Sequence, residues 1–138
     1  MTAGLQARRA RFISDGVATS PQTLLVLLYE RLVLDLDRAV EEQRAGRRAP
    51  ANRHLQHAQQ IITELAQALD TEVWPEGRQL AALYTFWLKE LVAANVSGDA
   101  DRTSAVRSLV APVAATWRSA LSSASGAPAA TPGLAVSS

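Results

Sequence analysis

The chain contains no cysteine, which excludes disulfides, thiol catalysis and cysteine metal sites and is typical of a reducing compartment. It also lacks long apolar runs: the longest, Leu24–Tyr29, is far shorter than the ~20 residues of a transmembrane helix. Residues 1–18 contain no continuous apolar segment of the kind that a signal peptide needs. We therefore expect a cytoplasmic protein without membrane insertion.

A clear excess of charge of one sign is lacking too, because 14 Lys and Arg residues face 13 Asp and Glu residues, for a formal net charge of +1. This balance does not indicate binding to nucleic acid. The arginines do cluster, at Arg8, Arg9 and Arg11 and again at Arg44, Arg47, Arg48 and Arg53. No aromatic side chains alternate with the second cluster as stacking platforms would. We expect solvated charge and no nucleic acid partner, and keep an RNA-binding bundle as an alternative.

What the chain has in abundance is helix-forming apolar sequence. Hydrophobic residues make up 48% of the 138 residues, aromatic residues only 5%, and no segment alternates as a strand would. Apolar residues recur at spacings of three and four in four segments, and each segment predicts a helix that faces a common core. Because the connections are short, the predicted fold class is all-α, an antiparallel four-helix bundle. Representative core positions are Leu25, Leu32, Leu36, Leu55, Leu65, Leu83 and Leu109.

Capping residues set the expected bounds of the helices. Thr19 or Ser20 caps the first helix, and Asp99 or Asp101 caps the fourth. Pro112 lies inside the fourth helix on its solvent side, where we expect a kink and not a break. The expected helices span about 19–45, 50–69, 78–96 and 99–121.

The sequence divides into three parts. Residues 1–18 lack a full helical period and are expected to form a mobile arm that carries the apolar pair Phe12 and Ile13. Residues 19–121 form the bundle. Residues 122–138 carry no charge, are rich in Ser, Ala, Gly and Pro, and are expected to be disordered.

The first helix carries more apolar surface than one buried face can use. The apolar positions outside the core stripes are Leu24, Leu27, Leu34 and, on the third helix, Phe86. Their neighbours on the first helix are charged and include Asp35. A small domain seldom leaves such surface without a use. Either a neighbouring element or a second copy covers it, or it forms a groove for an amphipathic partner helix.

Residues for catalysis are scarce. His54 and His57 are the only histidines, and zinc would need further ligands beside them. No Glu-x-x-His pair, Gly-x-Ser-x-Gly turn or Gly-rich phosphate loop is present. We expect no enzyme, no metal and no cofactor, with both histidines at polar or boundary positions of the second helix.

Several segments, in order, resemble the FliS family of flagellar export chaperones. Thr19-Ser20-Pro21 resembles the family's entry to its first helix, and Leu28-Tyr29-Glu30 resembles its L-Y-[DE] motif. The other matching positions are Ile61, Leu65, Leu69 and Asp70, then Leu83, Tyr84, Leu91, Ala94, Asn95 and Asp99, and finally Trp117. The resemblance covers about residues 12–120. Two features depart from it: Phe12 stands where the family often has a tyrosine, and the connector 71–78 is not Gly-rich.

The resemblance implies a cytosolic chaperone that binds the disordered C-terminal segment of flagellin. The client would wrap around the bundle as helices in apolar grooves, which prevents premature polymerisation until its release at the export gate. A generic helical adaptor, or a homodimer formed through the same surface, is the alternative. The residues expected to contact the partner are Phe12, Ile13, Pro21, Leu24, Leu27, Leu28, Tyr29, Leu34, Tyr84 and Phe86.

Overall fold

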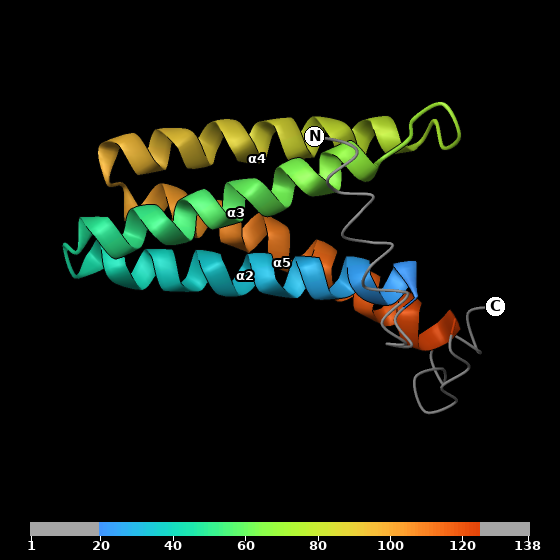
Figure 1. The fold of residues 1–138 in the computed structure, drawn as a ribbon, viewed down its shortest axis with the longest axis horizontal. Coiled ribbons are helices and arrows are strands. Elements are labelled where there is room, and N and C mark those ends of the chain that lie inside the picture. Colours follow the sequence, from blue (N-terminus) through green and yellow to red (C-terminus); the bar gives the residue numbers. More distant parts are fainter. Residues whose placement is uncertain (1–19, 125–138) are drawn as a thin grey trace.

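A computed structural model describes residues 20–124, and this part of the chain folds into four α-helices without any strand (Figure 1). The helices are α2 (Pro21–Arg44), α3 (Arg48–Ala68), α4 (Gly77–Ser97) and α5 (Ala100–Ala124). Both α2 and α4 pack mainly against α3 and α5, so α2 and α4 lie diagonally opposite each other. The predicted all-α antiparallel four-helix bundle is confirmed. The predictions for the N-terminal arm and for residues beyond 124 lie outside the described residues.

Local sequence signals explain where the helices begin. The Ser20 hydroxyl accepts a hydrogen bond from the Thr23 backbone N–H at 3.1 Å, which caps α2, and Pro21 takes the first helical position. Asp99 caps α5 in the same way, because its carboxylate accepts from the Arg102 backbone N–H at 3.1 Å. The start predicted for α3 is two residues late, since Pro50 lies within its first turn, where a missing N–H is tolerated.

The last helix is longer than expected. α5 continues through Pro112 and ends at Ala124, three residues beyond the predicted end of the bundle. Pro112 is exposed, so water can pair with the carbonyl that the missing proline N–H leaves free. Residues 122–124, which were expected to belong to a disordered tail, are therefore helical.

The core lies between the four helices, and its largest fully buried side chains are the aromatic Trp87, Tyr29 and Tyr84. Two predicted core positions are wrong: Leu83 is 38% exposed and Leu109 is 48% exposed. Both lie at the border of α4 and α5, and α5 runs obliquely away from α4 toward its C-terminal end (Figure 1). The two helices therefore do not close over these leucines.

Candidate partner-binding surface

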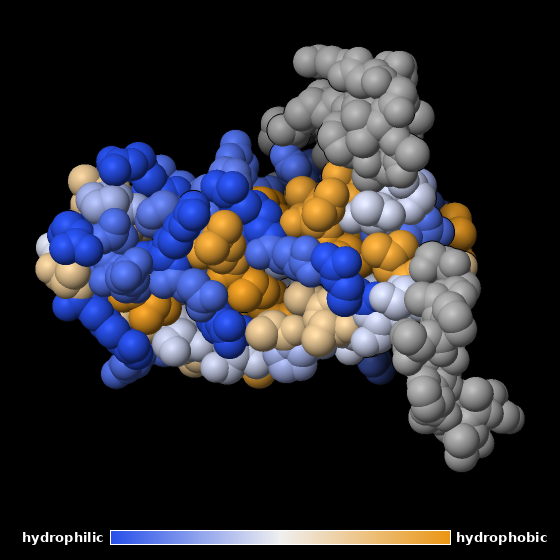
Figure 2. All heavy atoms as spheres, turned by 90° about the horizontal axis from the view of Figure 1, so that it is seen from below, coloured by the Kyte–Doolittle hydropathy of each residue, from blue (hydrophilic) through white to orange (hydrophobic). Residues whose placement is uncertain are grey.

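The outward-facing leucines of α2 form a ridge that consists of Leu24, Leu27 and Leu34 and is called the α2 ridge below. Leu27 is 45% exposed and Leu34 is 39% exposed, whereas Leu24 is partly buried. Leu27 and Leu34 are seven residues apart and so share one side of the helix. Figure 2 shows the bundle from below, with apolar side chains at the centre and right of this face and hydrophilic ones at its left end. An apolar strip of this kind suits a partner helix.

A hollow of about 360 Å³ follows the border between α2 and α3 and is called the α2–α3 groove below. Leu28 and Ile61 form its apolar floor. The polar side chains that line it are Arg31, His57, Gln60 and Glu64. Leu28 is partly buried.

A second hollow, of about 320 Å³, lies between α2 and α5 and is called the α2–α5 groove below. Its α5 wall is made of small residues, because Ala111, Ala114 and Ala115 line it. Small side chains let a partner approach the helix closely. Glu30 and Arg118 flank this groove and are joined by a hydrogen bond from Arg118 Nε at 2.9 Å. The α2 ridge is thus bordered by one groove on each side of α2.

The two tyrosines assigned to the partner-binding surface lie in the core. Tyr29 and Tyr84 are almost completely buried, and their hydroxyl oxygens are 2.7 Å apart, which joins α2 to α4 across the bundle. Burial raises the pKa of both hydroxyls, and the hydrogen bond between them raises the pKa of Tyr84 further. In this structure neither side chain reaches the surface, so the expectation of direct partner contact does not fit their position. The reason is that the L-Y pairs place Tyr on the stripe that faces the core.

The remaining predicted residues do not form one patch. Pro21 is exposed at the start of α2, on the same helix as the ridge. Phe86 is 46% exposed but belongs to α4, diagonally opposite α2. Phe12 and Ile13 lie outside the described residues. The structure therefore brings the α2 leucines together and separates them from Phe86.

Two further exposed apolar residues, Leu83 and Leu109, were assigned to the core from the sequence. The ion pair between Glu90 and Arg102, 3.2 Å long, sets α4 and α5 side by side in antiparallel register. Leu83 lies seven residues before Glu90 and Leu109 lies seven residues after Arg102, so the two exposed leucines lie at corresponding levels of the two helices. Phe86, Leu83 and Leu109 are thus exposed apolar residues of the neighbouring helices α4 and α5.

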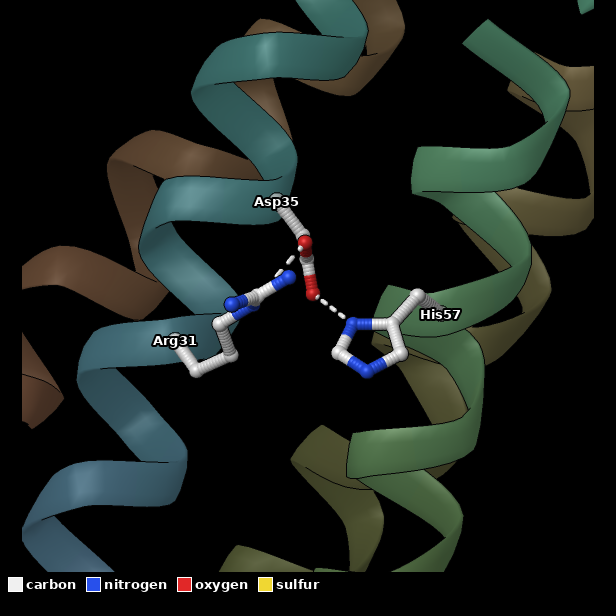
Figure 3. Close-up of polar contacts among 3 residues, drawn as sticks. All are labelled: Arg31, Asp35 and His57. Atoms are coloured by element: carbon white, nitrogen blue, oxygen red, sulfur yellow. Dashed lines mark hydrogen bonds and ion pairs between the residues drawn. The ribbon is translucent and has the colours of Figure 1, made fainter. Parts of the chain in front are cut away.

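A buried charge lies beside the α2–α3 groove. Asp35, expected among the solvated charges of α2, is completely buried and contacts both Arg31 and His57 (Figure 3). His57 was expected at a polar or boundary position, and it lies partly buried at such a boundary. One signal could have located Asp35: it follows Leu28 by seven residues, which puts it on the side of α2 that meets α3.

The arginines of the loop cluster lie at the end of the bundle away from the ridge and have partners within the protein. Arg48 donates to the backbone carbonyls of Asn95 and Val96, each at 3.3 Å, at the C-terminal end of α4. Arg47 forms an ion pair with Glu42. Arg47 and Arg48, two of the cations that an RNA would need, are thus engaged by groups of the protein itself.

The described part of the chain contains no candidate metal site and no membrane-spanning helix. Between residues 20 and 124, no group of three or more His, Asp or Glu side chains could hold a metal ion. None of the four helices is long and apolar enough to cross a membrane.

The family model of the flagellar protein FliS matches residues 5–124, well over half of the chain. No curated protein matches it.

Proposed function

Because the chain belongs to the FliS family of flagellar export chaperones, we propose that it binds the C-terminal segment of flagellin in the cytosol and keeps it from polymerising before export. The observation that carries this proposal is the α2 ridge with a groove on each side. Flagellin subunits polymerise by packing apolar faces of their terminal segments, so a chaperone that covers one such face blocks assembly. Release of the client at the export gate would free the same face.

The ridge supplies anchors at the spacing that a helical client needs. Leu24, Leu27 and Leu34 lie at offsets of three and seven residues, which match the repeat of an apolar helix face. Leu27 and Leu34 are each less than half exposed, so burying either contributes about 1 kcal/mol. Ordering the disordered client offsets part of this gain.

The test replaces one ridge leucine by a charge. Leu27→Asp and Leu34→Asp should each weaken binding of a synthetic flagellin C-terminal peptide at least tenfold in calorimetry, because the client would have to desolvate a carboxylate. Val96→Asp, at an exposed position near the C-terminal end of α4 and away from the α2 ridge, is the matched control and should leave the affinity unchanged. Far-UV circular dichroism should report the same helix content for all three variants.

Size-exclusion chromatography tests the alternative of self-association. A chaperone should form a heterodimer when the peptide is added. A stable homodimer that ignores the peptide, together with unchanged peptide affinity of Leu27→Asp, would overturn the proposal and favour an adaptor that uses the ridge for self-association.

A further inference from the structure

A buried carboxylate, that of Asp35, lies beside the α2–α3 groove. Asp35 is the only charged side chain that is fully buried within residues 20–124. Its two carboxylate oxygens have different partners: Oδ1 accepts from Arg31 Nε at 3.3 Å, and Oδ2 accepts from His57 Nδ1 (Figure 3). A buried carboxylate is stable only with such partners. Asp35 therefore holds two side chains, from two helices, in fixed positions.

Both partners keep hydrogen-bonding capacity toward solvent. The side chains of Arg31 and His57 are 50% and 44% exposed. Arg31 uses only Nε, and its terminal nitrogens have no other protein partner in the described part of the chain. His57 uses Nδ1, and its Nε2 points away from Asp35 (Figure 3). A guanidinium fork and an imidazole nitrogen are thus presented together beside the groove.

The groove beside Arg31 and His57 has an apolar floor, and its charged groups differ between its two ends. Leu28 and Ile61 line it together with Arg31 and His57. Glu64 also lines it and follows His57 by seven residues, which is about 10 Å along α3. The groove therefore has the Arg31 guanidinium near its His57 end, and a bound helix with one acidic residue would have a preferred direction.

We propose that the α2–α3 groove binds an amphipathic helix that places an aliphatic side chain on Leu28 and Ile61 and a carboxylate on the terminal nitrogens of Arg31, beside His57. Asp35 is the positioning residue, because it holds the Arg31 guanidinium and the His57 ring in place. This inference rests on the proposed function and adds the chemistry of the client at one groove. It makes the contact specific, since an apolar ridge alone accepts any apolar helix.

Isothermal titration calorimetry with a synthetic flagellin C-terminal peptide tests the inference. Arg31→Gln should weaken binding about fivefold, the effect of one partly exposed charge pair. It should also reduce the salt dependence of the affinity, a readout that a merely structural role would not change. Arg78→Gln, an exposed arginine of α4, the helix diagonally opposite α2, is the matched control and should bind like the unchanged protein.

A peptide series locates the acidic partner. Each Asp or Glu of the peptide is replaced in turn by Asn or Gln, and one replacement should weaken binding to the unchanged protein but not to Arg31→Gln. Arg31→Lys, which keeps the charge and loses the fork, should have intermediate affinity and serves if Arg31→Gln does not fold.

The outcomes separate the two proposals. No binding of the unmodified peptide overturns both. Binding with equal affinity and equal salt dependence by the unchanged protein, Arg31→Gln and Arg31→Lys overturns the inference and leaves the chaperone proposal standing. Tight binding of a peptide without any carboxylate also overturns the inference alone.

Discussion

The hydroxyl pair of Tyr29 and Tyr84 makes a quantitative prediction about the core. The two side chains come from diagonally opposite helices, and their oxygens are 2.7 Å apart in a region without solvent. Tyr84→Phe removes one hydroxyl and leaves Tyr29 without its partner. We expect the free energy of unfolding to fall by about 1–3 kcal/mol, the cost of a buried polar group whose hydrogen bond is lost. Tyr29→Phe should have a similar effect for the same reason.

The double variant distinguishes this mechanism from a simple loss of contacts. With both residues changed to Phe, no orphan hydroxyl remains, so the loss should be about 1 kcal/mol or less. The double variant should therefore be more stable than either single variant, and the coupling energy between the two changes should be about 1–5 kcal/mol. In thermal unfolding, a single change should lower Tm by about 4 °C or more for each kcal/mol.

Urea unfolding followed by far-UV circular dichroism measures all four proteins without relying on aromatic fluorescence, which the substitutions change. The same proteins should bind the flagellin peptide with equal affinity, because the two tyrosines do not reach the surface. Additive losses, so that the double variant costs the sum of both single variants, would refute the account of a mutually satisfied pair. A changed peptide affinity at equal stability would instead indicate that the tyrosines contact the partner.

Three other changes test the fold. Burial raises the tyrosine pKa values, so above about pH 10 the unfolded chain loses protons that the folded protein keeps. The free energy of unfolding should therefore be constant below that pH and fall above it, by up to about 1.4 kcal/mol per pH unit for each tyrosine. Urea unfolding of the double Phe variant at the same pH values should show a smaller fall. Leu65→Asp puts an unpaired charge in the core and should abolish the helical signal, whereas exposed Gln56→Asp should not. Gly98→Ala should lower Tm more than Gly46→Ala. Both glycines have positive φ, but only at Gly98 would a Cβ displace the Arg48 guanidinium, which donates to the carbonyls of Asn95 and Val96; equal shifts would contradict this.

The helices could be predicted because their signals are local. Ser20 and Asp99 cap the helices that follow them through a bond to a backbone N–H three residues later, and that geometry depends on nearby residues alone. The apolar repeats likewise follow from the period of one helix. Pro112 stays within α5 because its exposed position removes the main conflict, as the wheel position indicated.

The candidate site was predictable only in part. The surplus leucines of α2 were identified because each helix has a fixed number of positions for its core stripe. Asp35 was expected to be exposed but is buried, where it contacts His57 of α3. Leu109 was expected to be buried but is exposed, because α5 diverges from α4. Both outcomes depend on contacts between helices, which the apolar pattern of a single helix does not contain.

The amino-acid sequence by itself determined the number of helices between residues 20 and 124, their caps and the surplus of leucines on α2, because these depend on spacing along the chain. Tertiary structure alone decided which of these residues are covered. It paired the hydroxyls of Tyr29 and Tyr84 inside the core, buried Asp35 against α3 and left the α2 ridge between two grooves. The physical reason is that burial depends on the angle and register between helices, and many distant contacts set these together.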